Sequence, residues 1–419
     1  MKTLVAPILS QEQRSWRWKV FSATWLSYFG FYFSRKPYSI AKGSLERELG
    51  FTTDDLAWIY VAYLTAYAVG QFLAGYLGER LGARRALLIG TAVTLVCNFA
   101  FGLTNSVGTF ITLMFINGLA QATGWSNNVG MMAFWTHHSR RGSVMGIWGT
   151  NYHLCGILAN VVAAWGLGAL GFRYAFFLGS AVTLVTWAWG LYGLRNRPED
   201  LGLPAIAESE TEAAANPNSN SSAAESGTGW TRHLAVDVTL IGTYYFFVKF
   251  VRYALWSWAP YLLETKYGMK GNEAGYLSTL FDVGGFLGVI GAGVISDRVF
   301  QARHALTSFV FTVAMAGACA LAVTLGANSL PVFALSLFLI GVTLFGPDAL
   351  MSGAGAIEAG SPRTALVAAA VINGIGSFGP VVQELVLKDL VKGSSAAPVF
   401  VTLFGSSVLA IIFLSAVIL

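Results

Sequence analysis

The sequence predicts an all-α membrane protein with twelve transmembrane helices in two pseudo-symmetric six-helix halves. Three observations predict this fold class: an apolar composition, regularly spaced apolar segments and an internal repeat. Of the 419 residues, 55% are hydrophobic and only 11% are charged, and the mean hydropathy is +0.59. In soluble domains about a quarter of the residues are charged. The composition therefore excludes a soluble enzyme and a nucleic-acid binder, despite the net charge of +5.

Apolar segments of the length needed to cross a bilayer, about 20 residues, recur along the whole chain. Six precede a polar stretch rich in Ala, Ser, Asn and Glu, and six follow it. Such a stretch is typical of a flexible linker. We expect one bundle over 1–194, a cytoplasmic linker over 195–235 and a second bundle over 236–419. The expected spans are 18–41, 55–78, 85–104, 107–130, 143–168, 173–194, 236–263, 274–296, 304–326, 331–357, 364–391 and 397–419.

The distribution of Lys and Arg predicts the orientation, because cytoplasmic loops carry an excess of these residues. With both termini in the cytoplasm, fifteen of the 26 fall in cytoplasmic segments and seven, Lys42 among them, in outer loops. The basic N-terminal stretch has no small-residue cleavage site, so we interpret it as a cytoplasmic lead-in. We expect an integral protein of a bacterial inner membrane. The three cysteines and five histidines show no metal-ligand spacing, and we expect neither a metal nor a cofactor.

The two halves repeat each other in sequence. An acid followed by an arginine ends the second span at Glu79-Arg80 and the eighth at Asp297-Arg298, 218 residues later. Two arginines within spans, Arg35 and Arg252, are related by nearly the same offset of 217 residues. Many secondary transporters are built from paired halves of this kind.

Charged side chains inside a span are costly and are usually functional. A guanidinium suits bidentate binding of phosphate or carboxylate. We therefore expect Arg35 and Arg252, one from each half, to bind a phosphoryl group near the midplane. The alternative is that these cations snorkel to the headgroups or form internal ion pairs. Tyr28, Tyr32 and Tyr67 are expected to add hydroxyl groups, although ordinary aromatic packing would explain each tyrosine singly.

The first six spans contain no acidic residue in their interiors, so Arg35 has no acidic partner in its own half. The second half has four acids, at Asp282, Asp348, Glu358 and Glu384. Because buried charges are normally paired, we expect one of these acids to pair with Lys249. The alternative is that Asp282 or Asp348 carries the proton of a symporter.

These residues resemble the organophosphate:phosphate antiporters of the major facilitator superfamily. The resemblance covers most of the chain and is strongest over Tyr28–Pro37, Asn117–Trp125, Arg195–Pro204 and Val251–Pro260. It implies the major facilitator fold, two phosphate-binding arginines at Arg35 and Arg252, and cavity tyrosines at the positions given above. The superfamily's loop signature falls on the repeated segments and implies a cytoplasmic gate that consists of Gly75, Glu79, Arg80, Arg84, Asp297 and Arg298.

Several positions depart from the glycerol-3-phosphate transporters of this family. Their second-span lysine is Gln71 here, and their fifth-span histidine matches His153 only after a shift of one residue. Two of their tyrosines become Phe345 and Ser377. At Lys249 the chain is similar to the animal sugar-phosphate exchangers, and this lysine would replace the cation lost at Gln71. We therefore expect the phosphate end of the site to be retained, with Gln71, His153 and Lys249 in the altered part.

The resemblance implies a monomeric carrier in a lipid bilayer that exchanges a phosphorylated small metabolite for inorganic phosphate by alternating access. Two alternatives stay open. One is a proton-coupled symporter of a sugar or an organic anion, which would need a titrating acid. The other is a membrane sensor of a sugar phosphate, which would bind its ligand with little flux.

Overall fold

The computed structural model describes residues 10–136, 144, 147–206, 232–301, 303–326, 329–358 and 362–418. Within them the chain forms twelve α-helices and a short 3-10 helix, η2 (Pro198–Leu201), which confirms the all-α fold. The first six α-helices are α1 (Gln11–Leu49), α2 (Thr53–Leu81), α3 (Ala83–Phe101), α4 (Val107–Trp135), α6 (Asn151–Leu170) and α7 (Phe172–Gly193). The other six are α9 (Arg232–Tyr267), α10 (Gly271–Arg298), α11 (His304–Thr324), α12 (Leu330–Glu358), α13 (Pro362–Leu390) and α14 (Ala397–Ile418).

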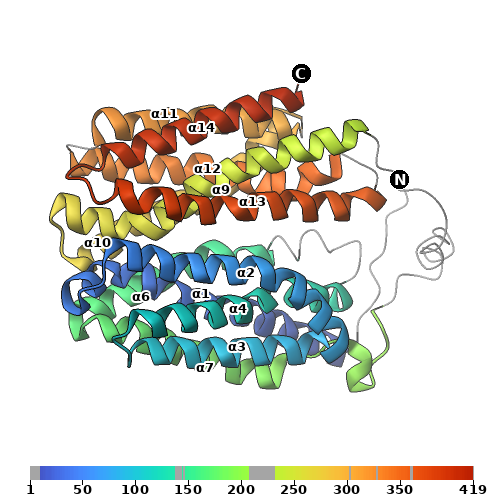
Figure 1. Cartoon of the computed structure of the whole chain (residues 1–419). Coiled ribbons are helices and arrows are strands. Elements are labelled where there is room, and N and C mark those ends of the chain that lie inside the picture. The colour runs from blue at the N-terminus through green and yellow to red at the C-terminus, as the bar shows by residue number, and fades with distance from the viewer. Residues whose placement is uncertain are drawn as a thin grey trace.

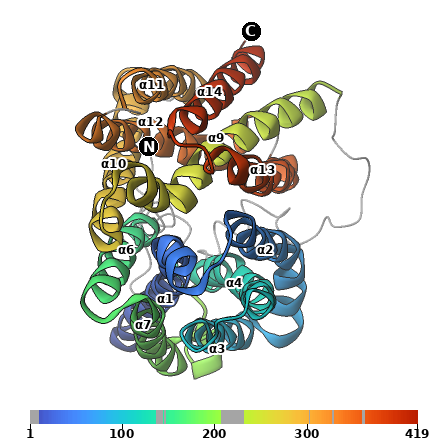
Figure 2. The same cartoon turned by 60° about the vertical axis from the view of Figure 1, so that its left-hand side comes forward.

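The helices form two bundles of six that lie side by side (Figure 1). Equivalent pairs pack within each bundle: α2 with α4 and α1 with α7 in the first, α10 with α12 and α9 with α14 in the second. The bundles meet where α1 contacts α9, α2 contacts α13 and α6 contacts α10 (Figure 2). We call the end that holds the start of α1 and residues 194–206 the linker end, and the end that holds loops 50–52 and 268–270 the distal end.

The helices differ in how apolar they are. Among the described residues, eight helices are long and apolar enough to cross a membrane. The remaining four, α1, α2, α9 and α13, lie where the bundles meet. Three of them carry charged residues well inside the helix, such as Arg35, Arg252 and Glu384. The protein interior, and not lipid, can accommodate these groups, which explains why these four interface helices are less apolar than the other eight helices.

Helix α1 is longer than the expected span 18–41. It begins after Ser10, whose side chain and that of Gln13 form a capping box, and it ends at Gly50, which adopts a positive φ of 70°. Lys42 therefore lies inside the helix and is fully buried. Its predicted position in an outer loop was wrong, because partners from the other bundle, described below, let the helix continue through a polar stretch.

The segment of α1 that carries Arg35 packs closely on α7. Pro37 cannot donate a hydrogen bond to the carbonyl of Phe33 one turn earlier, and a Cβ at Gly179 would meet that same carbonyl oxygen. Ser34 and Thr183 also share a hydrogen bond of 2.8 Å between their hydroxyl oxygens. These contacts fix the rotation of α1, so that Arg35 faces away from α7.

Candidate functional site

Arg35 is buried in the first bundle among neutral groups. Its Nε donates to Oε1 of Gln121 on α4 at 3.0 Å, and the hydroxyl of Tyr63 donates to the same oxygen at 3.0 Å. The guanidinium lies over the rings of Tyr32, Tyr63 and Tyr67, with centroid distances of 5.2, 5.6 and 5.2 Å. Among the described residues its partners are thus an amide and three aromatic faces, which orient the cation without neutralising it.

Arg252 is buried in the second bundle beside a carboxylate. Its Nη1 donates to Oδ2 of Asp348 on α12 at 2.7 Å, and this is an ion pair. The guanidinium also lies over the rings of Trp256 at 4.4 Å and Phe345 at 5.0 Å. The two repeat-related arginines therefore have different electrostatic surroundings.

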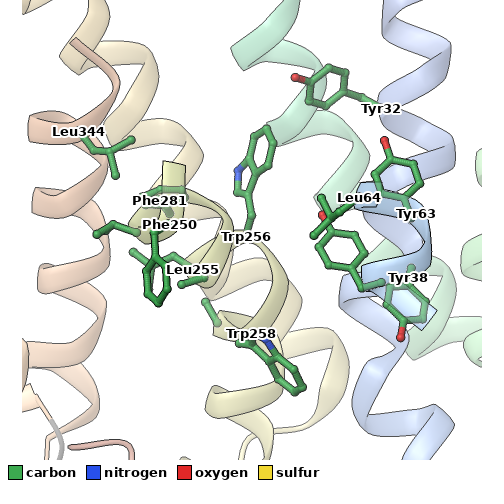
Figure 3. Packing of buried hydrophobic residues seen from close by; sticks show 14 of the residues in the cluster. Tyr32, Tyr38, Tyr63, Leu64, Phe250, Leu255, Trp256, Trp258, Phe281 and Leu344 are labelled. Carbon is green, nitrogen blue, oxygen red and sulfur yellow. The ribbon is translucent and has the colours of Figure 1, made fainter. Parts of the chain in front are cut away.

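Two aromatic rings connect the arginines across the interface. The ring of Tyr32, which contacts Arg35, meets the ring of Trp256, which contacts Arg252, edge to face at 6.0 Å (Figure 3). Tyr28 packs on Tyr32 with a centroid distance of 5.7 Å. The structure thus brings together both arginines and the three tyrosines expected from the sequence, in one aromatic site between the bundles.

Lys249 lies one turn from Arg252 on α9 and bonds to neutral groups. Its Nζ donates to Oδ1 of Asn373 at 2.7 Å and to Oγ of Ser377 at 3.4 Å, both on α13, and lies over the ring of Tyr245 at 4.6 Å. Lys249 therefore does not form the expected ion pair with a described acid, although Asp348 lies near enough to interact with it electrostatically. Of the candidate acids, Asp348 pairs with Arg252, and Asp282 and Glu384 pair with Lys36 and Lys42 of α1.

The other predicted residues are placed as follows. Gln71 lies on α2 one turn after Tyr67 and is half-buried. The side chains of His153, Gly75, Glu79 and Asp297 lie outside the described set. Arg80 and Arg298 are exposed, while Arg84 donates to the carbonyl of Leu191 at 2.9 Å within the first bundle. The cytoplasmic gate stays a prediction.

Charge pairs between the bundles follow α1 from the arginines toward the distal end. Lys36 donates to Oδ2 of Asp282 on α10 at 3.0 Å, and that oxygen also accepts from Asn160 at 3.0 Å. Trp256 Nε1 donates to the other oxygen of Asp282 at 2.7 Å. Further along, Arg47 pairs with Glu264 of α9. A helix rises about 1.5 Å per residue, so these pairs hold the bundles together over roughly 16 Å.

Lys42 forms the most buried of these contacts. Its Nζ donates to Oε1 of Glu384 on α13 at 2.8 Å and to Oγ of Ser257 at 2.6 Å. The other oxygen of Glu384 accepts from Trp258 Nε1 at 2.9 Å, and neither charged side chain of the pair is exposed. With Lys42 itself on α1 and its partners on α9 and α13, the cluster joins both bundles, so a change that separates the distal ends must break it.

The distal rim adds exposed pairs. Lys388 and Lys392 donate to the two carboxylate oxygens of Asp54 at 2.7 and 2.6 Å. Hydrogen bonds with Asp54 and Asp389 raise the pKa of Lys392. A cavity of about 480 Å³ opens here beside Arg47 and Glu264, and neither Arg35 nor Arg252 lines it. Among the described residues, no group of His, Cys, Asp and Glu could hold a metal ion.

Sequence analysis did not single out Tyr63, Gln121, Trp256 or the Lys36–Asp282 pair. Tyr63 precedes Tyr67 by one helical turn, so its helical spacing was a usable signal. Gln121 and Trp256 lie within the segments that carry the family resemblance, but no local pattern marks them as site residues. Their roles depend on neighbours that are distant in sequence.

Replacing Gln121 with Leu tests whether orientation of Arg35 matters. The change would remove the acceptor shared by Arg35 and Tyr63 and leave both donors buried without it, which costs about 1–3 kcal/mol per group. We expect the affinity for a phosphoryl ligand to fall about tenfold, with the twelve-helix fold intact by circular dichroism. An affinity equal to that of the unmodified protein would show that Gln121 does not orient Arg35.

Fold and site together define a membrane carrier built from two helical bundles, with its cationic residues where the bundles meet. The family model described as Major Facilitator Superfamily matches residues 24–383. The chain is 27% identical to the "Probable hexose phosphate transport protein" of Chlamydia trachomatis, over 97% of this chain and 91% of that one. It is 29% identical to the "Glucose-6-phosphate exchanger SLC37A2" of Danio rerio, over 97% and 93%.

A solved structure shows the same fold. The nucleoside transporter NupG, crystallised as a point mutant, has a TM-score of 0.70 at 14% identity, over 96% of this chain and 99% of that one. The chain belongs to the Major Facilitator Superfamily and, within it, to the organophosphate:phosphate antiporter family. It is therefore a membrane transport protein and not an enzyme.

Proposed function

We propose that this chain exchanges a phosphorylated small metabolite, of the sugar phosphate or glycerol phosphate type, for inorganic phosphate. The observation that carries the proposal is the pair of buried guanidiniums, one from each bundle, joined by the Tyr32 and Trp256 rings. A phosphoryl group has enough oxygens to accept from both forks at once. The names of the relatives from Chlamydia trachomatis and Danio rerio agree with a sugar phosphate as the organic substrate.

Alternating access follows from the same geometry. A phosphoryl group bound by Arg35 and Arg252 would draw the two bundles together around it. Without substrate, Arg35 is a buried cation that has no described counter-charge, which is energetically costly. Closure around substrate is thus favoured over closure of the empty carrier. Differential binding of this kind is what shifts a two-state equilibrium, and it couples outward movement of one anion to inward movement of another.

With the predicted orientation, the contacts toward the distal end correspond to a conformation that is closed to the outside. If the distal end faces outward, the pairs of Lys36, Lys42 and Arg47 seal the site from the outside. We propose that the protein acts as a monomer, since one chain supplies both arginines, in a bacterial inner membrane with both termini in the cytoplasm. The domain limits at 194 and 236 and the cytoplasmic gate are part of this proposal.

A second candidate is proton-coupled symport, which the Asp348–Arg252 ion pair favours, because a carboxylate within the site is a group that such a symporter needs. The two candidates differ in what drives uptake. An exchanger needs a phosphate compound on the opposite side of the membrane, whereas a symporter needs a proton gradient.

Exchange in liposomes tests the proposal. Vesicles that contain the purified protein and radiolabelled phosphate would be diluted into buffer alone, or buffer with phosphate, glucose 6-phosphate, glycerol 3-phosphate or phosphoenolpyruvate. We expect efflux of label to depend on an external phosphate compound, and the most effective compound identifies the organic substrate. Uptake driven by a pH gradient without internal phosphate would favour the symporter. Binding of a sugar phosphate without flux would indicate a sensor.

A further inference from the structure

Asp348 distinguishes the two arginines of the site. It lies on α12 and is 7% exposed, and it forms an ion pair with Arg252, whereas the described partners of Arg35 are neutral. Resting on the proposed function, we propose that Asp348 is an internal anion that competes with the phosphoryl group of the substrate for Arg252. When the carboxylate re-forms its ion pair with Arg252, it lowers the affinity for substrate and speeds substrate release.

The bonding of Asp348 differs from that of the other buried acids. Both oxygens of Asp282 and both oxygens of Glu384 accept hydrogen bonds, from Lys36, Asn160 and Trp256 in the first case and from Lys42, Ser257, Trp258 and Gln383 in the second. Asp348 is bonded through Oδ2 alone, and its buried Oδ1 has no hydrogen-bond partner among the described residues. Buried structural carboxylates are normally satisfied at both oxygens. A carboxylate held by one bond can leave Arg252 without breaking a wider network.

The charge arrangement then decides the effect on binding. A phosphoryl dianion that reaches Arg252 comes to lie beside the carboxylate of Asp348, and like charges in one buried site repel each other. The carboxylate must swing away before the substrate can use the guanidinium, and it can return when the substrate leaves. Arg35 has no described competitor of this kind, so it is the arginine that first captures the anion.

Removal of the carboxylate changes the affinity for phosphate, and the direction of this change distinguishes a competing role of Asp348 from a structural one. If Asp348 competes with substrate, Asp348→Asn tightens phosphate binding. If Asp348 merely orients Arg252, the same change loosens Arg252 and weakens binding. Asp348→Glu keeps the charge and serves as the matched control, and Glu199→Gln removes an exposed charge at the linker end, far from the site.

The experiment measures equilibrium binding of inorganic phosphate to the purified full-length protein by calorimetry, and exchange of labelled phosphate in liposomes at saturating phosphate. For Asp348→Asn we expect a dissociation constant about tenfold lower and slower exchange at saturation, because release becomes limiting. For Glu199→Gln we expect both values to stay near those of the unmodified protein. Asp348→Glu keeps the negative charge beside Arg252, so we expect it not to tighten phosphate binding.

An unchanged or higher dissociation constant for phosphate in Asp348→Asn would overturn the proposal. If the unmodified protein still binds phosphate in that case, the proposed function is not contradicted. Absence of binding and exchange in the unmodified protein would instead overturn the proposed function. If Asp348→Asn does not accumulate in the membrane, Asp348→Ser removes the same charge and carries the same prediction. Failure of both neutral variants to fold would show a structural role and contradict the proposal.

Discussion

Replacing Arg35 or Arg252 with Ala abolishes phosphate exchange, because each guanidinium supplies charge-assisted hydrogen bonds that no neighbour can replace. Truncation of one partner in a buried charge pair costs about 2–5 kcal/mol, so we expect phosphate to bind roughly thirtyfold to several thousandfold more weakly. Arg35→Lys recovers only part of this loss, since an ammonium cannot form the bidentate fork. Calorimetry on the purified variants measures the change. Arg14→Ala, at an exposed position of the same helix, is the control and retains binding.

The two arginine variants differ in stability. Arg35→Ala removes a cation from neutral surroundings, whereas Arg252→Ala leaves the buried carboxylate of Asp348 without its ion-pair partner. Breaking a buried ion pair in this way costs about 3–5 kcal/mol. We therefore expect Arg252→Ala to unfold at a lower temperature than Arg35→Ala, and the double variant Arg252→Ala, Asp348→Ala to recover stability without recovering exchange. Equal unfolding temperatures for the two single variants would contradict the different surroundings described for them.

Breaking the Lys42–Glu384 pair opens the distal end. Either Lys42→Ala or Glu384→Ala leaves a fully buried charge alone, at a cost of about 3–5 kcal/mol that falls only on the conformation closed at that end. The double variant Lys42→Met, Glu384→Met removes both charges and is expected to be about as stable as the unmodified protein, but without the polar contact that joins α1 to α13. All three variants should therefore favour the distally open state.

Spin labels at exposed positions on opposite sides of the distal interface measure this opening. Glu48→Cys on α1 and Lys270→Cys before α10 provide such a pair. In the otherwise unmodified protein we expect a short distance between the labels. In the Lys42 and Glu384 variants the distance distribution should move to longer values. A distribution that does not change would show that other contacts, such as Lys36 with Asp282, keep the distal end closed.

Much of the fold could be predicted from the sequence, for physical reasons. A bilayer imposes long apolar helices with internally satisfied backbones, so segment counting and the Lys and Arg bias carry most of the information. The internal repeat added the pairing of Arg35 with Arg252, since equivalent positions of two similar bundles meet at their common interface. Tyr32 followed from helical spacing relative to Arg35, whereas Tyr67 followed from its place at the middle of the second span and from the family resemblance. The structure places both rings against the guanidinium.

The charge pairing could not be predicted, because it depends on distances between helices. The second half contains several acids, and the spans contain several cations. The sequence around each of these residues does not show which acid pairs with which cation. Lys42 illustrates the difficulty: its position looked like a loop because the apolar run ends before it. Its burial depends on Glu384 and Ser257, which lie more than 200 residues away along the chain. A helix can continue through polar residues wherever another bundle supplies partners of this kind.

The central claim is that one phosphoryl group binds both arginines at once, and a structure determined with inorganic phosphate bound tests it most directly. We predict phosphate oxygens within about 2.7–3.2 Å of guanidinium nitrogens of both Arg35 and Arg252, with the bond between Arg252 and Asp348 broken. Phosphate bound to one arginine alone, or elsewhere with the Arg252–Asp348 pair intact, would contradict the account.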